Sequence, residues 1–351
     1  MTTAEAESWT GPPTRADAEL YALLLGLAGR IPDEGLAEMR LCLADGEEAD
    51  LASVLAAEIG TGRLALTESE AGLARVLFEE CGTDPGAADR APRIEAPPAP
   101  PYRFGDEYGT TMPNGDGGES RRDAMDAVVV EAGERVGGLI GIWRVFRHAH
   151  EGPARRVYLA EAEAGALVSE LVAETQYALT EASEDTPRVE VFAEGTPLPT
   201  YHDAALGGAT LLWAASDTSV RLARAFDGAT AGDGPYFRED HPRLDGPDGE
   251  RVLAYLCSGE PILTTPGVLD DVLDPGQPGV VPAGFRSDGR WIWPDAVAYY
   301  LKHHRLAPEP DLIAHALGNS SPPHPLNRLT RHRVLTTLFD PTVGEPVWQA
   351  G

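Results

Sequence analysis

The stretch that most constrains the fold is residues 285–304, Phe-Arg-Ser-Asp-Gly-Arg-Trp-Ile-Trp-Pro-Asp-Ala-Val-Ala-Tyr-Tyr-Leu-Lys-His-His, where aromatic residues are densest. Asp288-Gly289 is typical of a tight hairpin, because glycine adopts the positive φ that a two-residue turn needs. Residues 291–293 would form the returning strand. Pro294 cannot continue a strand ladder but fits the first turn of a helix. Apolar residues then recur at helical spacing. This stretch predicts a hairpin, a sharp corner and a helix.

The two tryptophans of this stretch can form an aromatic wall. Trp291 and Trp293 are two residues apart, so both side chains lie on the same face of a strand. Tyr300 on the following helix can extend the wall. The wall is either part of a core or a binding surface. We expect at least one tryptophan in the core, and name Trp291, Trp293 and Tyr300 as candidate binding residues.

Four segments in and near this stretch resemble a known module. They are Gly-Glu-Pro-Ile-Leu-Thr-Thr (259–265), Phe-Arg-Ser-Asp-Gly-Arg-Trp-Ile-Trp (285–293), Tyr-Tyr-Leu (299–301) and Ala-Pro-Glu-Pro (307–310). Together they resemble a C-terminal module of uncharacterised proteins from high-GC actinobacteria, especially streptomycetes. The resemblance covers less than a fifth of the chain and implies no activity, cofactor or catalytic residue.

Charge and cysteine content limit the partners and the compartment. The chain has 28 Lys and Arg residues against 56 Asp and Glu residues, for a net charge of −28. A chain this acidic is repelled by nucleic acids and anionic membranes, so we expect neither as a partner. Cys42, Cys81 and Cys257 are too far apart for a zinc motif and too few for a disulfide framework. Without a signal peptide or a long apolar run, we expect a cytoplasmic protein.

The composition along the chain predicts an α+β fold in several parts. Residues 1–15 are expected to be disordered. Residues 16–81 contain four segments with apolar residues at helical spacing, which predict a small helical domain. Residues 82–118 are rich in Pro and Gly and predict an extended linker. Residues 119–215 predict a mixed sheet with helices on one face. Residues 216–351 predict a C-terminal α+β module packed on the preceding domain, and the sequence leaves open whether these last two segments form one domain.

Two aromatic residues in the predicted linker are candidates for binding. Tyr102 and Phe104 lie just after the run Ala-Pro-Pro-Ala-Pro-Pro. They could form a short linear motif that docks on a partner, or they could cover apolar surface of the chain itself. Both are named as candidate binding residues.

Complete catalytic signatures are missing from the sequence: there is no P-loop, HExxH, GxSxG or kinase set. His148 and His150 have a spacing that puts both rings on one face of a strand. They are candidate metal ligands with a third ligand from elsewhere, or they form an exposed hairpin tip. Tyr201-His202-Asp203 is placed in a loop, where His202 could be a general base oriented by Asp203, or a histidine that caps a helix.

A further histidine pair follows Tyr300 on the aromatic helix. His303 and His304, with Asp295 at the start of the helix, could bind a ligand. His304 falls on the apolar face, where a hydrogen-bonded core histidine is the alternative. No cofactor is expected.

The sequence therefore leads to two functional hypotheses. The first is a non-enzymatic, cytoplasmic protein–protein interaction protein, or an accessory component of a bacterial multi-protein system for conflict, immunity or a large assembly. The second is a hydrolase or transferase with an aromatic-lined pocket, which uses His202 or the His148/His150 pair. A deep cleft that holds Tyr201, His202 and Trp291 together would favour the enzyme.

Overall fold

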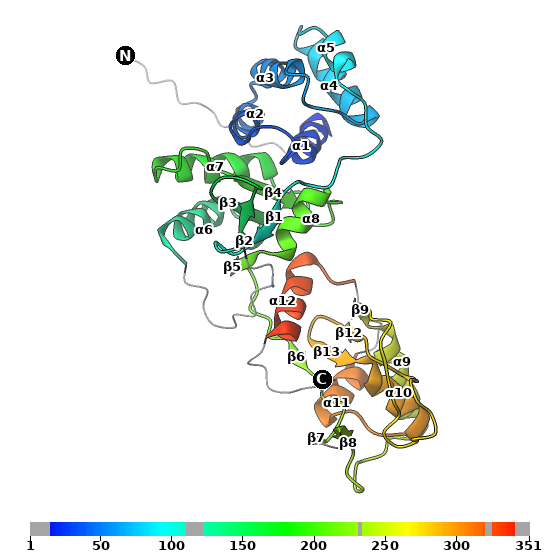
Figure 1. Ribbon diagram of the computed structural model, residues 1–351. Helices are drawn as coiled ribbons and strands as arrows, with labels where there is room; N and C mark the ends of the chain where they lie inside the picture. The colour runs from blue at the N-terminus through cyan, green and yellow to red at the C-terminus, as the bar shows by residue number, and fades with distance from the viewer. Residues whose placement is uncertain (1–14, 110–121, 231–233, 320–324, 341–351) are drawn as a thin grey trace. The chain divides into compact units, whose positions relative to one another are not determined.

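The computed structural model describes residues 15–109, 122–230, 234–319 and 325–340 (Figure 1). These residues form two compact units. Unit 1 contains the described residues up to Ser216, and unit 2 contains those from Asp217 onward. The predicted α+β fold with an N-terminal helical region is confirmed. The expected disorder of residues 1–15 concerns a segment that lies, apart from Arg15, outside the described residues.

The N-terminal part of unit 1 is helical, as the apolar spacing predicts. The fourth helix begins with a capping box: the Thr67 hydroxyl accepts from the Glu70 amide, and the Glu70 carboxylate accepts from the Thr67 amide. Gly46 ends the second helix in the left-handed conformation. The helices are α1 (Arg15–Leu27), α2 (Asp33–Asp45), α3 (Glu48–Gly60), α4 (Glu68–Glu80) and the short α5 (Gly86–Arg90).

The sheet of unit 1 is mixed and is built around its longest strand. Its strands are β1 (Arg103–Gly105), β2 (Leu139–His148), β3 (Arg155–Ala162), β4 (Val189–Ala193) and β5 (Thr210–Ala214). β2 and β3 form an antiparallel hairpin, and β4 pairs parallel to β3 after α7 (Val168–Glu181) crosses over. The other edge of β2 pairs with two short strands, β5 along residues 141–144 and β1 along residues 146–148.

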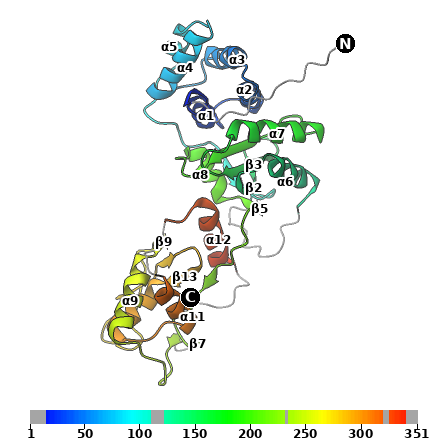
Figure 2. The ribbon, with the colours of Figure 1, turned by 180° about the vertical axis from the view of Figure 1, so that it is seen from behind.

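Helices cover both faces of this sheet, whereas the sequence predicted only one covered face. Val189 and Val191 of β4 face the side of α6 (Ala124–Val136) and α7. Because side chains alternate along a strand, Glu190 points to the opposite face. There it contacts Arg40 of α2 and His202 of α8 (Thr200–Gly207). Figures 1 and 2 show α7 lying next to α2, and the Gln176 side chain of α7 donates to the Ala37 carbonyl of α2 at 3.0 Å.

The prediction that residues 82–118 form an extended linker is wrong for residues 82–109. This segment contains α5 and β1, and β1 is hydrogen-bonded to β2. Residues 110–118 lie outside the described residues. The helical segment is not a tethered domain either, because the Tyr21 hydroxyl donates to the Val191 carbonyl at 2.8 Å and Arg40 pairs with Glu190. The N-terminal helices and the sheet therefore belong to one unit.

Unit 2 holds a four-stranded sheet in the order β6-β13-β12-β9, with β6 (Arg221–Leu222) parallel to its neighbour and the other pairs antiparallel. The remaining strands of the sheet are β9 (Glu260–Leu263), β12 (Phe285–Ser287) and β13 (Trp291–Pro294). Two small ladders join β7 (Gly228–Thr230) to β8 (Gly234–Tyr236) and β10 (Val268–Leu269) to β11 (Val281–Pro282). The helices are α9 (Gly246–Ser258), α10 (Asp295–His304), α11 (Pro310–Gly318) and α12 (Arg328–Phe339).

The predicted hairpin, corner and helix form β12, β13 and α10. The turn is closed by side chains: the Ser287 hydroxyl donates to the Trp291 carbonyl at 2.7 Å, and Asp288 Oδ1 accepts from the amides of Arg290 and Trp291. Gly289 has φ +88°, which glycine adopts without strain. The sequence Ser-Asp-Gly thus sets the turn by local hydrogen bonds.

Both tryptophans of this hairpin lie in the core of unit 2. Trp291 is 4% exposed and Trp293 is fully buried, and the Trp293 indole donates to the Leu256 carbonyl at 3.1 Å. The expectation of at least one core tryptophan is confirmed. The candidate binding role of Trp291 and Trp293 is corrected, because both side chains are packed in the core and neither lines the open pocket of unit 2.

Candidate functional site

Unit 2 contains an open pocket with a volume of 360 Å³. One wall comes from the irregular segment after β6, and the other from α10, the following turn and α11. The volume lies within the range of small-ligand sites, about 300–1,000 Å³. Its apolar lining is formed by Phe226, Phe237, Val297, Tyr300, Leu306 and Ile313.

Three aromatic rings of the lining pack on one another. The ring centroids of Phe226 and Phe237 are 5.3 Å apart, and those of Phe237 and Tyr300 are 4.8 Å apart. Phe226 and Tyr300 meet edge to face at 5.6 Å. Because these are contact distances, a cation does not fit between the rings. The rings therefore act as an apolar wall and not as a cage for an ammonium group.

Charged side chains at the pocket are paired, with one exception. Arg224 Nε lies 2.8 Å from Glu309 Oε1, and Asp227 Oδ2 lies 2.9 Å from His241 Nδ1. Within the described part of the chain, the exposed guanidinium of Arg238 forms no hydrogen bond or ion pair, although its charge acts on Asp227 and its backbone amide donates to the same side chain. The pocket thus combines an apolar interior with one cationic group able to pair with a ligand.

His241 connects the two walls of the pocket. Its Nδ1 contacts Asp227, and its Nε2 lies 3.0 Å from the Ala307 carbonyl oxygen of the opposite wall. Burial alone would raise the pKa of Asp227, but the Arg238 amide and the His241 ring hold it below its usual value. Asp227 is therefore a carboxylate at neutral pH.

The candidate base His202 does not lie in a loop, as the sequence predicted, but in α8, where it is fully buried. Its Nε2 lies 2.7 Å from Glu190 Oε2, and Glu190 pairs with Arg40 at 2.5 Å. Burial alone would raise the pKa of Glu190, but Arg40 and His202 lower it to about 2. Asp203 is exposed and forms no hydrogen bond with the ring. Since no substrate reaches a fully buried imidazole, the catalytic role of His202 and Asp203 is corrected.

Tyr201 belongs to the same buried network. Its hydroxyl accepts a hydrogen bond from Arg147 at 3.3 Å, and Arg147 also forms a two-point ion pair with Asp33. Arg188 reaches the same Asp33 carboxylate at 2.6 Å. Burial raises the pKa of the Tyr201 hydroxyl well above its usual value. This network fixes α2 and α8 on the sheet, and it explains Tyr201 as a structural residue.

The linker aromatics pack against this network. Phe104 is buried and meets Tyr201 edge to face at 5.1 Å, and Tyr102 does so at 6.4 Å. The Arg147 guanidinium also lies 4.6 Å from the centre of the Tyr102 ring. Both residues therefore cover surface of their own unit, which corrects their assignment as partner-binding residues.

The candidate metal ligands His148 and His150 do not share a strand face. β2 ends at His148, and His150 lies in the exposed turn that follows. His148 Nε2 lies 2.8 Å from the Asp106 carbonyl oxygen. Among the described residues, no group of three or more His, Cys, Asp or Glu side chains is placed to hold a metal ion.

Of the aromatic-helix candidates, Tyr300 alone lines the pocket. His304 Nε2 lies 2.6 Å from Asp271 Oδ2, which fits a hydrogen-bonded, partly buried histidine. His303 is exposed and stacks on Tyr299 with ring centroids 4.5 Å apart. Asp295 pairs with Arg286 and not with either histidine.

Sequence reasoning missed the other pocket residues and one buried hub. Phe226, Phe237 and His241 lie in a Gly- and Asp-rich segment with no periodicity, and the only available signal was a pair of phenylalanines flanking a short hairpin. The hub is Asp288, whose Oδ2 accepts from the Tyr255 hydroxyl at 2.6 Å and contacts His315 Nε2 at 2.5 Å. It joins the hairpin turn to α9 and α11.

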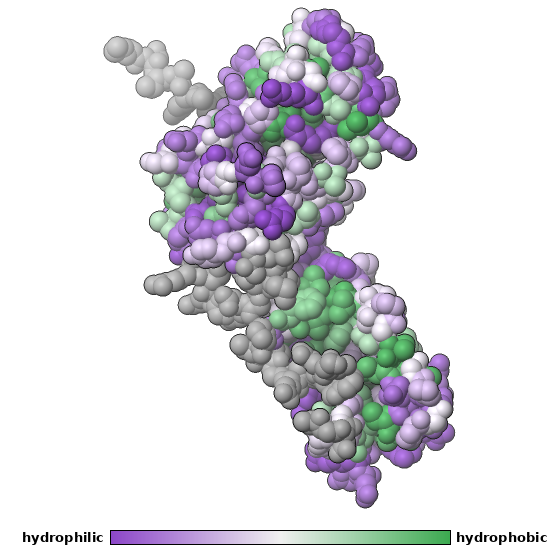
Figure 3. All heavy atoms as spheres, viewed as in Figure 1, coloured by the Kyte–Doolittle hydropathy of each residue, from purple (hydrophilic) through white to green (hydrophobic). Residues whose placement is uncertain are grey.

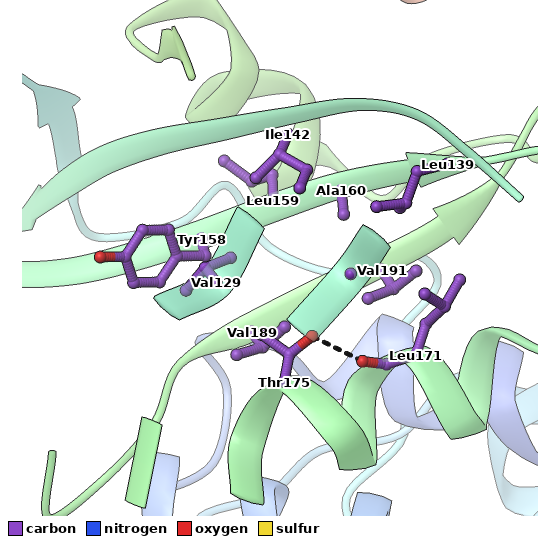
Figure 4. Close-up of a pocket in the computed structure, with 11 residues that line it drawn as sticks. Val129, Leu139, Ile142, Tyr158, Leu159, Ala160, Leu171, Thr175, Val189 and Val191 are labelled. Atoms are coloured by element: carbon purple, nitrogen blue, oxygen red, sulfur yellow. Dashed lines mark hydrogen bonds between the residues drawn. The ribbon is translucent and has the colours of Figure 1, made fainter. Parts of the chain in front are cut away.

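Unit 1 contains a second, much smaller cavity of 10 Å³ between the sheet and α6–α7 (Figure 4). Valine, leucine and isoleucine side chains from both layers point into it. The Thr175 hydroxyl on its wall donates to the Leu171 carbonyl, and the Tyr158 hydroxyl donates to Asp126. An apolar space of this size is a packing gap and not a ligand site.

No known protein family, no curated protein and no solved structure matches the chain. Among the described residues, none of the helices combines the length and apolar character needed to cross a membrane. The pocket in unit 2 is therefore the main indication of function.

Proposed function

We propose that this chain is a non-enzymatic cytoplasmic binding protein whose unit 2 holds a bulky apolar group of a protein partner. The observation that carries the proposal is the 360 Å³ pocket with its wall of Phe226, Phe237 and Tyr300. A setting in a bacterial multi-protein system follows only from the resemblance of the four segments within residues 259–310 to an actinobacterial module.

The charges at the pocket favour a partner group that carries a carboxylate. Asp227 and Glu309 already pair with His241 and Arg224, so neither acid is available to a cationic ligand. The exposed guanidinium of Arg238 can pair with an anion next to the apolar group. A partner segment that ends in a bulky apolar residue, or that places Asp or Glu beside one, has this chemistry.

The surface of unit 2 also suits a binding role. Of the nine exposed large hydrophobic residues described, six lie in unit 2: Tyr236, Leu263, Val268, Leu273, Val280 and Phe339. Figure 3 shows hydrophobic residues over much of the visible face of unit 2. Acidic residues are concentrated elsewhere, with 38 acidic and 16 basic residues in residues 1–216 and 18 and 12 in residues 217–351. Electrostatic repulsion of an anionic group is therefore weaker at unit 2.

The enzyme hypothesis receives no comparable support from the geometry. His202 is buried in unit 1, and neither His148 nor His150 lines the pocket of unit 2. The histidine that does line it, His241, has a hydrogen-bond partner on each ring nitrogen. It therefore has no free nitrogen to act as a base on a bound group.

A titration with small probes tests the proposal. Methyl NMR of the full-length protein would follow Val297 during addition of 3-phenylpropanoate, which joins an apolar ring to a carboxylate, and of its neutral amide. We expect saturable shifts with the acid, and affinity lower by about fivefold for the amide or after Arg238→Gln. Ile313→Arg should abolish the shifts, whereas Ala314→Arg, on the exposed side of the same helix, should not. Identical shifts in both arginine variants would contradict the proposal.

A further inference from the structure

We propose that His241 is a proton-dependent latch that holds the two walls of the pocket together and releases them when its ring loses a proton. One wall carries Asp227, Phe237 and His241 itself, and the other carries Ala307. The inference rests on the proposed function only in taking this pocket as the binding site.

The partners of His241 determine its charge. The Ala307 carbonyl oxygen can only accept a hydrogen bond, and so can the ionised carboxylate of Asp227. Each ring nitrogen must therefore donate an N–H. A neutral imidazole has one N–H and an imidazolium has two. Both contacts, at 2.9 and 3.0 Å, are favourable together only in the imidazolium form.

The charged groups around the ring support this form. Asp227 faces Nδ1, and the backbone amide of Arg238 donates to the same carboxylate oxygen at 2.8 Å. Across the pocket the nearest charges are Arg224 and Glu309, which neutralise each other. The Arg238 guanidinium also lines the pocket, and its charge helps to keep Asp227 ionised. Tyr300, which contacts Phe237, is neutral in this pH range.

Loss of the proton leaves a nitrogen lone pair facing an acceptor oxygen, so one of the two contacts becomes repulsive. The phenyl ring of Phe237 packs edge to face on His241 at 5.1 Å and on Tyr300 at 4.8 Å, so it moves with the histidine. Other links between the walls remain, including the hydrogen bond from the Ala307 amide to the Pro242 carbonyl. Deprotonation therefore loosens the pocket wall without unfolding unit 2.

Because only the imidazolium form makes both contacts, we expect the wall to be more ordered in acidic than in alkaline solution, and probe binding to weaken as the pH rises. Because His304 and His315 also contact carboxylates in unit 2, the test must isolate His241.

Hydrogen exchange of the full-length protein without any ligand provides this test. Exchange of peptides that cover residues 225–242, corrected for the intrinsic effect of pH, would be compared at pH 6 and pH 8. We expect about a tenfold rise at pH 8, as for the loss of one charge-assisted hydrogen bond. His241→Gln should remove the difference between the two pH values. His303→Gln, which changes an exposed histidine of the same unit, should keep it.

A direct measurement covers the case in which His241→Gln perturbs folding. Long-range ¹H–¹⁵N spectra of the histidine rings in the unmodified protein should show both His241 nitrogens protonated where exchange is slow and one protonated where exchange is fast. A neutral His241 where exchange is slow, or an equal rise in exchange in His241→Gln, would overturn the latch. Failure of the probe titration would instead overturn the proposed binding function, because the exchange and ring measurements contain no ligand.

Discussion

Removal of Arg40 should strongly destabilise unit 1, because it leaves a buried charge without its main partner. Arg40 is 2% exposed and Glu190 is 3% exposed. The guanidinium makes two contacts with the Glu190 carboxylate, at 3.0 and 2.5 Å, and donates to the Val189 carbonyl at 2.7 Å. In Arg40→Met the carboxylate retains only His202. Breaking a buried pair in this way costs about 3–5 kcal/mol in the free energy of unfolding.

The loss of stability caused by Arg40→Met should become smaller at low pH. The pKa of Glu190 is lowered to about 2 in the folded protein, so its ion pair adds stability above the unfolded-state pKa of about 4.3. That stability is lost as the pH falls from there toward 2. In Arg40→Met the carboxyl loses the neighbour that lowers its pKa. The difference between the two proteins should therefore be largest at pH 7 and decrease below about pH 4.

Urea titration read by hydrogen exchange in peptides from α2 and β4 measures unit 1 separately from unit 2. Arg90→Met is the matched control, because Arg90 is an exposed arginine paired with the exposed Asp84 in the same unit. We expect no measurable change in that control. An Arg40→Met protein as stable as the control would refute the buried pair and the docking of α2 on the sheet.

Three further predictions test other contacts. Trp293→Ala should lower the free energy of unfolding of unit 2 by about 3–5 kcal/mol in a urea titration, and an unchanged midpoint would contradict its core position. Burial alone would raise the pKa of Asp288, but hydrogen bonds, the first from Tyr255, hold it below its usual value, so Asp288→Asn should lose stability at pH 7, and the difference from the unmodified protein should decrease as the pH falls below the usual Asp value of about 3.9. Gly29→Ala should destabilise more than Gly62→Ala in thermal melts. Both glycines have positive φ, but only the methyl group added at Gly29 would clash, because it would lie 2.6 Å from the Tyr201 ring.

Local signals in the sequence were sufficient for most helices and for the hairpin of unit 2. Pro294 ends a strand and begins a helix in almost any context, and Gly289 permits the turn between two strands. The capping box at Thr67 likewise fixes a helix start from four adjacent residues. Such elements are predictable because their causes lie within a few residues.

Long-range partners explain the errors in unit 1. Phe104 lies after a proline-rich run that favours an extended linker, but β2 is long enough to pair with two short strands along one edge, and β1 is one of them. The imidazole of His202 has the chemistry of a general base, but its role is structural because it pairs with Glu190, twelve residues away. Glu190 in turn pairs with Arg40, 150 residues before it in the sequence. No local pattern reveals these contacts.

The pocket could not be predicted from the sequence because its residues are also ordered by long-range contacts. Phe226, Phe237 and His241 lie in a segment whose regular structure, among its described residues, is a three-residue hairpin ladder. Its order comes from contacts with residues 305–309, such as the hydrogen bond from the Leu244 amide to the Arg305 carbonyl. Sequence periodicity identifies helices and strands, whereas this wall is held by side chains and isolated backbone bonds.

Selection of peptides from a random library with free C-termini tests most directly whether the pocket binds a protein partner. The full-length protein, Ile313→Arg and the matched control Ala314→Arg would be compared. We predict enriched peptides with a bulky apolar residue beside a carboxylate, equal binding to the unmodified protein and Ala314→Arg, and affinity for Ile313→Arg lower by about tenfold or more. Peptides that bind all three proteins equally, or no enrichment at all, would contradict the account.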